Sequence, residues 1–100
     1  MRKFKLSKAA DADLGNIPDY ALKSWGKAQR NTYIQAFFEA FDRLASTPQI
    51  ATEIHHIRAG YRKFPQGSHV IYFIESNAQE IVIIRVLHKR MDVDTNITFP

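Results

Sequence analysis

The residues in this sequence that could do chemistry are mainly histidines, tyrosines and arginines in its second half. Metal-independent cleavage of an RNA phosphodiester needs a base for the 2′-hydroxyl, an acid for the leaving oxygen and cations for the developing charge. The sequence supplies those chemical types at Arg62, His69, Tyr72, Arg85, His88 and Lys89. These are common residue types, so the set is compatible with a ribonuclease without identifying one.

Other catalytic classes lack the residues that they need. The sequence has no cysteine, which excludes a thiolate nucleophile, a disulfide scaffold and a cysteine zinc site. His55 and His56 are adjacent, so on a strand they would point to opposite faces, a poor arrangement for chelating one metal. Ser68 precedes His69 without the Gly-x-Ser-x-Gly elbow of a serine hydrolase. We therefore expect no metal and no cofactor.

The charge distribution is more informative than the net charge of +4. No acidic residue occurs between Glu53 and Glu75, whereas Arg58, Arg62 and Lys63 all fall in this interval. The interval is either a solvated face of strands and turns or a surface that binds phosphate or an acidic protein segment. No apolar run approaches the roughly 20 residues that span a bilayer, so we expect a cytoplasmic protein without membrane contact.

Two arginines near the end of the sequence have simple structural explanations. Arg85 lies in a nearly continuous apolar run, where it would extend its stem along the sheet or pair with a carboxylate such as Glu75 or Asp92. Arg90 and Asp92 would share one side of a continuing strand. A local ion pair between them would be worth about 0–1 kcal/mol if exposed.

The first part of the sequence predicts a short strand and a helix. Residues 4–6 could form the strand, and Ser7 is typical of an N-cap because its hydroxyl can accept a bond from an orphan amide. Apolar residues then recur at helical spacing as far as Trp25. Pro18 predicts a kink or a short break, and Gly26 predicts the end of the helix.

A second helix is predicted from an apolar stripe at i, i+3, i+4 and i+7 spacing. The stripe consists of Ile34, Phe37, Phe38, Phe41, Leu44 and Ala45, extended by Tyr33. Pro48 stops this helix. The short joint at Gly26 predicts an antiparallel helical hairpin.

The sequence after Pro48 predicts strands and turns. The strands are expected at residues 54–58, 61–64, 69–74 and 81–87. The turns are expected at Gly60, at residues 65–67 and at residues 76–80. Residues 1–100 thus form one α+β domain, with an N-terminal two-helix hairpin packed on one face of an antiparallel sheet of about three to four strands. Phe37, Phe38 and Phe41 would pack on residues such as Ile71, Phe73 and Ile83.

Several of these segments occur in this order in one known family. They are Asp13-Leu14, Trp25-Gly26, Gly60-Tyr61-Arg62, Ser68-His69-Val70-Ile71-Tyr72-Phe73 and Ile84-Arg85-Val86-Leu87-His88-Lys89-Arg90-Met91-Asp92. Together they resemble the ParE branch of the ParE/RelE toxin superfamily, over essentially the whole sequence to Asp92. The resemblance implies a compact α+β toxin with a two-helix hairpin on an antiparallel sheet.

The resemblance also implies a partner and a target. The partner would be a ParD-type antitoxin, whose ribbon-helix-helix part binds operator DNA and whose C-terminal segment wraps the toxin. Contact with operator DNA would therefore be indirect. ParE-type toxins act on DNA gyrase and stall replication, whereas their RelE-type relatives cut messenger RNA on the ribosome.

The end of the sequence favours the gyrase branch, and so a toxin that binds its target rather than an enzyme. RelE-type nucleases often have a tyrosine close to the C-terminus, and here no tyrosine follows Tyr72. The expected target-binding residues are Arg58, Tyr61, Arg62, Lys63, Arg85, His88, Lys89 and Arg90. In the alternative, a ribosome-dependent endoribonuclease, the catalytic residues would be Arg62, His69, Tyr72, Arg85 and His88. A third reading is an interaction module that has lost toxicity and only binds its antitoxin.

Overall fold

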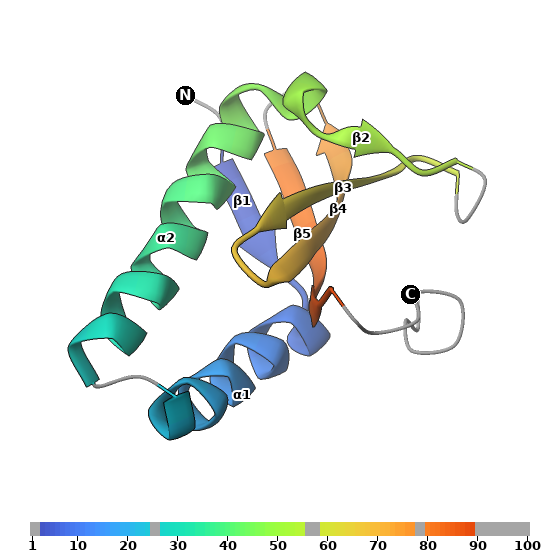
Figure 1. Ribbon diagram of the computed structural model, residues 1–100. Helices are drawn as coiled ribbons and strands as arrows, with labels where there is room; N and C mark the ends of the chain where they lie inside the picture. The colour runs from blue at the N-terminus through green and yellow to red at the C-terminus, as the bar shows by residue number, and fades with distance from the viewer. Residues whose placement is uncertain (1–2, 25–26, 56–58, 78–79, 90–100) are drawn as a thin grey trace.

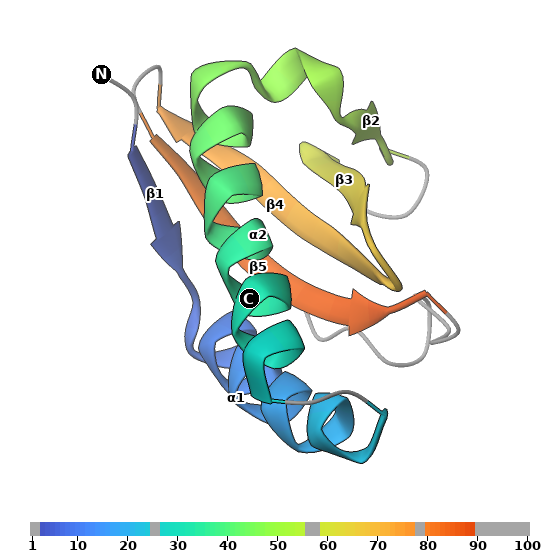
Figure 2. The ribbon, with the colours of Figure 1, turned by 60° about the vertical axis from the view of Figure 1, so that its left-hand side comes forward.

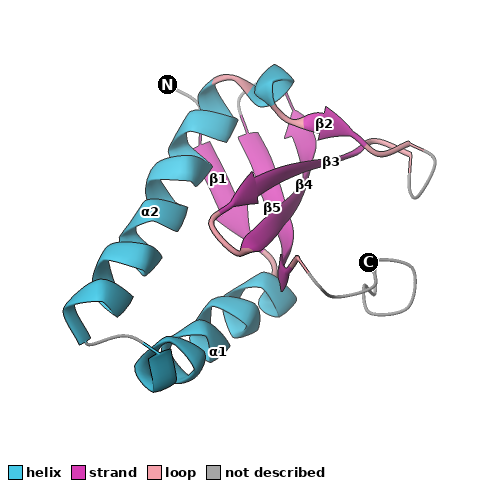
Figure 3. Cartoon of the chain, viewed as in Figure 1, coloured by secondary structure: helices cyan, strands magenta, loops and turns pink. Residues whose placement is uncertain are grey.

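The computed structural model shows two helices packed on a five-stranded sheet (Figures 1 and 3). The elements are β1 (Lys3–Leu6), α1 (Lys8–Ser24), α2 (Lys27–Ser46), the 3-10 turn η1 (Pro48–Ile50), β2 (Thr52–Glu53), β3 (Tyr61–Gln66), β4 (His69–Asn77) and β5 (Glu80–His88). The structure describes residues 3–24, 27–55, 59–77 and 80–89, and side chains for residues 3–16, 31–55, 59–76 and 80–89. The predicted α+β class is confirmed.

The sheet is mixed, which corrects the expected antiparallel sheet of three to four strands. Its strand order is β1-β5-β4-β3-β2. Neighbouring strands from β2 to β5 are antiparallel, but β1 lies parallel to β5, with Lys3 opposite Glu80 and Leu6 opposite Ile83. A parallel partner requires a long crossover connection. The connection from β1 to β5 runs through both helices and then through β2, β3 and β4.

The strand boundaries differ from the prediction at the β2 edge. A strand was expected at residues 54–58, but the pairing with β3 is made by Thr52–Glu53. Ile54 follows the strand and donates its N–H to the carbonyl oxygen of Tyr61, 3.0 Å away. Residues 56–58 lie outside the described residues. The edge strand is short because backbone pairing ends once the chain turns away from β3.

The expected turn at residues 65–67 lies further along the chain, at Gly67 and Ser68. Pro65 instead lies within β3, opposite Val70. Backbone groups alternate in direction along a strand, so each residue's N–H faces one edge or the other. The carbonyl of Tyr61 points toward β2. Pro65 lies an even number of residues further along the strand, so its backbone nitrogen faces the same edge. The register with β2 does not reach Pro65, so its missing N–H costs no ladder bond there.

The predicted N-cap of α1 is confirmed. The hydroxyl of Ser7 accepts a hydrogen bond from the N–H of Ala10 at 3.0 Å, and the Ser7 carbonyl accepts one from Asp11 at 3.0 Å. The predicted break at Pro18 is absent, since one 17-residue helix spans Lys8–Ser24. A proline removes a single bond from the ladder, and the rest of the helix continues around it.

The two helices diverge instead of lying side by side, so the antiparallel hairpin is not confirmed. Figure 2 shows α2 lying across the sheet, and both views place the start of α1 near the end of β5 (Figures 1 and 2). The helix α1 contacts both β5 and α2, whereas on the sheet α2 contacts β1, β3 and β5. Gly26, the expected joint, lies outside the described residues.

The core between α2 and the sheet follows the predicted stripe closely. Phe37, Phe41, Leu44 and Ala45 are buried and share one cluster with Ile71, Phe73 and Ile83. The prediction for Phe38 is wrong, because 40% of this residue is exposed. Phe38 lies toward the β1 side of α2, with its ring centroid 6.3 Å from that of Phe4.

A second, smaller core lies on the other face of the sheet. It contains Ile54, Tyr61, Tyr72, Ile84 and Leu87. Both faces of β5 are therefore buried, which explains its nearly continuous apolar sequence. The register between β4 and β5 shifts between Tyr72 and Phe73, so that β5 carries one extra residue at this bulge.

The end of β1 leaves an unpaired stretch of β5, and the start of α1 covers it. Ser7 donates its N–H to Ile83 at 2.9 Å and its hydroxyl to the Ile84 carbonyl at 2.7 Å. In the second turn of α1, the Asp13 carboxylate accepts the N–H of Val86 at 3.0 Å. Side chains of α1 thus replace the strand partner that β5 loses where β1 stops.

The same carboxylate binds the side chain of Arg85. Nε of Arg85 donates to Oδ2 of Asp13 at 2.7 Å, and Nη2 donates to Oδ1 at 2.9 Å. Only 17% of the arginine side chain and 12% of the aspartate side chain is exposed. A two-pronged, mostly buried pair of this kind fixes both the position and the rotation of α1 on β5.

Replacing Asp13 with asparagine should lower the free energy of unfolding by about 2–3 kcal/mol. The change leaves a mostly buried guanidinium without its countercharge, and breaking a buried pair in this way costs several kcal/mol. Urea unfolding followed by circular dichroism measures the change. The matched control, Asp42→Asn on the exposed side of α2, should stay within about 0.5 kcal/mol. Equal effects of the two substitutions would contradict the role given to Asp13.

Candidate functional site

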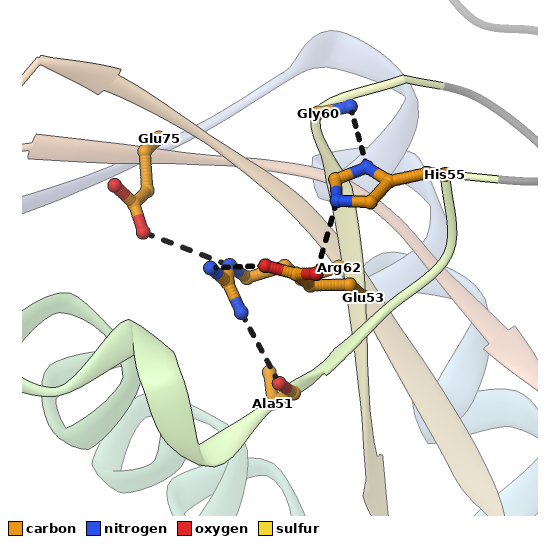
Figure 4. A network of polar contacts seen from close by, with 6 residues as sticks. All are labelled: Ala51, Glu53, His55, Gly60, Arg62 and Glu75. Carbon is orange, nitrogen blue, oxygen red and sulfur yellow. Dashed lines mark hydrogen bonds and ion pairs between the residues drawn. The ribbon is translucent and has the colours of Figure 1, made fainter.

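Arg62, one of the cations of the acid-free interval, is paired in space with both of the acids that bound that interval. Arg62 on β3 donates from Nη2 to Oε1 of Glu53 at 3.1 Å, and its Nε lies 3.6 Å from Oε1 of Glu75 (Figure 4). Nη1 also lies 3.4 Å from the carbonyl oxygen of Ala51. Only 20% of the Arg62 side chain is exposed. Arg62 therefore ties β2 and η1 to the sheet.

His55 extends this network at the β2 edge. Its Nε2 lies 3.0 Å from Oε2 of Glu53, and its Nδ1 accepts the N–H of Gly60 at 3.2 Å (Figure 4). Both side chains of the His55–Glu53 pair are more than half exposed. Pairs this exposed are worth little in stability, so the contacts shape the loop more than they stabilise the fold.

Arg85 pairs with a carboxylate, as one of the two structural explanations expected, but with neither of the acids that the sequence suggested. Its partner is Asp13, and the hydrogen bonds to that carboxylate raise the pKa of Arg85 above its usual value. Glu75 instead approaches Arg62. Asp92 lies outside the described residues. The guanidinium of Arg85 is thus engaged within the fold and mostly buried.

Tyr61 and Tyr72 are both buried on the sheet face that lies away from the helices. Tyr61 is 6% exposed and Tyr72 is 4% exposed, and both belong to the second core. Burial raises the pKa of the Tyr72 hydroxyl above its ordinary value, so the phenol stays protonated at neutral pH. In this position both rings serve packing.

His69 lies on the opposite face, under the start of α2. Its Nδ1 is 2.7 Å from the hydroxyl of Tyr33, and its ring packs edge-on against that of Phe37. Burial, helped by the neighbouring His88, lowers the pKa of His69 to about 4. The ring is therefore neutral at pH 7, and its Nδ1 can accept the Tyr33 hydroxyl proton.

The structure places the four members of the alternative catalytic set on β4 and β5 in two cross-strand pairs, His69 with His88 and Tyr72 with Arg85. Of these, His69 and His88 have their rings in contact. They form a cross-strand pair at the end of β4 and β5, with ring centroids 5.4 Å apart. Tyr72 lies on the other face of the sheet. Arg62 pairs with Phe73, which places it roughly 13 Å along β4 from His69 at the rise of an extended strand.

Lys63 and Lys89 are the exposed cations in the expected target-binding set. Within the described part of the chain, neither amino group has a carboxylate partner. Lys63 lies opposite Thr52 and Tyr72, so its side chain shares the face of the second core. Lys89 directly follows β5, and His88 beside it is partly exposed. Arg58 and Arg90 lie outside the described residues.

Comparison with known protein families agrees with this fold and these motifs. A family model described as the ParE toxin of the type II toxin–antitoxin system parDE matches residues 4–93. The chain belongs to the ParE toxin family. The resemblance inferred from the motifs is therefore confirmed, and the family is that of a toxin component of type II toxin–antitoxin systems.

Curated ParE toxins match over nearly the whole chain. Toxin ParE1 of Mycobacterium tuberculosis is 40% identical, over 95% of this chain and 97% of its own length. Toxin ParE1 of Caulobacter vibrioides is 32% identical, over 97% of this chain and 99% of its own. Toxin ParE of Escherichia coli is 26% identical, over 97% of this chain and 94% of its own.

Solved structures of toxin–antitoxin systems share the fold. A chain of the chromosomal ParDE system from P. aeruginosa superposes with a TM-score of 0.74 at 21% identity, covering 88% of this chain and 96% of that one. A chain of the RelBE2 toxin–antitoxin complex of Mycobacterium tuberculosis gives a TM-score of 0.65 at 20% identity, covering 88% and 98%. At these identities the likeness concerns the fold.

Two residues that organise this ParE-family fold were not recognised as such from the sequence. Asp13 was identified only as part of a motif, and Tyr33 only as an extension of an apolar stripe. Each acts through partners far along the chain, Arg85 for Asp13 and residues 66–69 for Tyr33. In the sequence Asp13 is a carboxylate early in a helix and Tyr33 is a hydroxyl on an apolar stripe. Neither pattern indicates which distant residue would be the partner.

The described residues contain no group of three or more histidine, aspartate or glutamate side chains that could hold a metal ion. Among the described helices, neither is both long enough and apolar enough to cross a membrane.

The neutral state of His69 makes the stability of the protein depend on pH. Its pKa is about 4 in the folded protein against 6.5 in an unfolded chain, so between these values the unfolded state binds more protons. The free energy of unfolding should therefore fall by about 1–2 kcal/mol as pH drops from about 7 to about 5. Urea unfolding at both pH values measures this.

The substitution His69→Gln should flatten that pH dependence, because it removes the titrating group. The control His55→Gln changes an exposed histidine and should keep the slope of the parent protein. If His69→Gln and the parent lost the same stability between the two pH values, the buried neutral imidazole would not be its source.

Proposed function

We propose that this ParE-family toxin inhibits DNA gyrase by binding it and does not cleave RNA. The observation that carries this proposal is that the side chains able to do acid–base chemistry do not converge on one exposed site. His69 is buried and neutral under α2, Tyr72 is buried on the opposite sheet face, and Arg85 is bound to Asp13. A general base and a general acid must both reach the same phosphodiester.

The proposed target-binding surface uses the exposed cations that the fold does not employ. These are Lys63 on β3 and Lys89 after β5. The partly exposed His88, whose ring packs against that of His69, lies next to Lys89 and belongs to the same proposed surface. Exposed lysines without carboxylate partners attract an acidic protein segment and speed its approach. Arg58 and Arg90 belong to the same proposal on sequence grounds. Tyr61, Arg62 and Arg85 support the surface from within the fold.

A ParD-type antitoxin is the proposed partner, and β1 is its proposed docking edge. Among the described strands, β1 pairs only with β5, so its other edge is open. Ser7 bonds toward β5, and by the alternation of a strand the backbone groups of Phe4 and Leu6 face outward. The exposed Phe38 lies beside Phe4, while Lys3 and Lys5 are exposed.

This edge fits a strand in which apolar and acidic residues alternate. Apolar side chains on one face of the added strand would meet Phe4 and Phe38, and acidic ones on the other face would meet Lys3 and Lys5. The amino group of Lys5 already lies 3.7 Å from Glu80 while its side chain stays 70% exposed. A basic, open strand edge next to exposed aromatic surface is thus available to an acidic amphipathic segment.

Gyrase inhibition should depend on the exposed lysines of the target-binding surface. The double variant Lys63→Glu/Lys89→Glu should need at least about tenfold more protein to inhibit supercoiling of relaxed plasmid by purified gyrase. The double variant Lys3→Glu/Lys5→Glu changes the net charge equally and should inhibit like the parent. Absence of inhibition and of trapped cleaved DNA at excess toxin would refute the gyrase proposal. Codon-specific cuts seen by primer extension on messenger RNA would favour the RelE-type alternative.

Antitoxin binding should depend on the lysines of β1 and not on those of the target-binding surface. The probe is the ribbon-helix-helix protein expected from the neighbouring reading frame, measured by calorimetry and by rescue of growth on co-expression. Lys3→Glu/Lys5→Glu should weaken binding by about tenfold or more, since it places acids against an acidic strand. Lys63→Glu/Lys89→Glu should bind like the parent. Unchanged affinity of the first variant would remove β1 as the docking edge.

A further inference from the structure

The hydroxyl of Tyr33 lies where three parts of the fold meet. It accepts a hydrogen bond from the N–H of Ser68 at 3.0 Å and lies 2.7 Å from Nδ1 of His69. The carbonyl oxygen of Gln66 is 3.5 Å away, at the limit of a hydrogen bond. One side chain of α2 therefore contacts the last residue of β3, the turn and the first residue of β4 through a single oxygen.

The turn itself is shaped around the Tyr33 ring. Gly67 has φ +60, which with the negative φ of Ser68 is typical of a tight hairpin turn whose first central residue is glycine. A Cβ atom at Gly67 would lie 2.6 Å from Cε1 and 2.7 Å from the hydroxyl oxygen of Tyr33. The backbone of the turn thus lies directly against the ring, and a side chain at this position would displace one of them.

The β3–β4 turn also holds the end of β5. The carbonyl oxygen of Ser68 accepts the N–H of Lys89 at 2.9 Å, directly beyond the His69–His88 pair that ends the β4–β5 ladder. The N–H and the carbonyl of Ser68 therefore link Tyr33 on one side with Lys89 on the other. A hydrogen-bonded path runs from α2 through the turn to the first residue after β5.

We propose that Tyr33 is a positioning residue for target binding. Its hydroxyl fixes the β3–β4 turn, and through Ser68 it sets the place where Lys89 leaves the sheet. Tyr33 does not touch the target. This inference rests on the proposed function, because the value of a fixed Lys89 lies in presenting its amino group to gyrase.

A purely structural role for Tyr33 would rest on its ring, and the ring can be kept. Its centroid lies 5.2 Å from that of Phe37 in an edge-to-face contact and 5.7 Å from that of His69. The substitution Tyr33→Phe keeps this packing and removes only the oxygen, which bonds the turn at Ser68 and the adjoining His69. The hydroxyl is therefore separable from the core.

The experiment compares Tyr33→Phe with a stability control, Ile71→Val, which trims a buried residue of the same core away from the turn. Amide hydrogen exchange followed by NMR reports the protection of the Ser68 and Lys89 N–H groups. Supercoiling by purified gyrase reports inhibition. In Tyr33→Phe we expect at least about tenfold faster exchange at both amides and about three- to tenfold weaker inhibition. In Ile71→Val we expect parent-like inhibition and parent-like relative protection of these amides.

The outcomes separate this inference from the proposed function. If the parent protein inhibits gyrase and Tyr33→Phe inhibits equally well, Tyr33 is not a positioning residue. Unchanged protection of the Lys89 amide in Tyr33→Phe overturns the inference whatever the target is. If the parent protein does not inhibit gyrase, the proposed function fails and the claim for target presentation fails with it. Faster exchange at Lys89 would then support only the path from α2 to the end of β5.

Discussion

The fold depends on how the Asp13 carboxylate completes β5. The strand β5 is an interior strand buried on both faces, yet its parallel neighbour at the edge, β1, spans only Lys3–Leu6. Beyond that point the backbone of β5 needs partners that water cannot supply in a packed interior. Ser7 takes the Ile84 carbonyl, and Asp13 takes the Val86 N–H and the Arg85 guanidinium. Side chains at the start of the first helix thus continue the hydrogen bonding of the sheet beyond the end of β1.

Local rules explain which parts of the fold could be predicted from the sequence. The N-cap at Ser7, the buried stripe of Phe37 and Phe41 and the strands around Ile71 and Ile83 follow from spacing within a few residues. The Asp13–Arg85 pair spans 72 residues, and the parallel pairing of β1 is also long-range. No periodic signal encodes such contacts. Phe38 fits the stripe by spacing but lies past the edge of the surface that the sheet offers.

The ion pairs of the candidate site also depend on long-range contacts that local sequence patterns do not indicate. Sequence order separates Arg62 from Glu53 and Glu75 and so suggests a bare basic segment, whereas the pairing of β2, β3 and β4 brings both acids to that arginine. The sequence shows which residues are cationic, but only the fold determines which of them form ion pairs within the protein. Part of the family motif, including Arg62 and Arg85, therefore supports the structure that any surface function must rest on.

The second helix connects the two proposed surfaces without forcing them to act together. Phe38 borders the open edge of β1, and Tyr33 holds the β3–β4 turn at the other end of the sheet. On the same helix Phe37 and Phe41 are fully buried against the sheet, and packed interiors resist small displacements. A partner strand added at β1 would thus leave the turn in place. The helix that borders both proposed surfaces is thus held in place by its own core rather than by either surface.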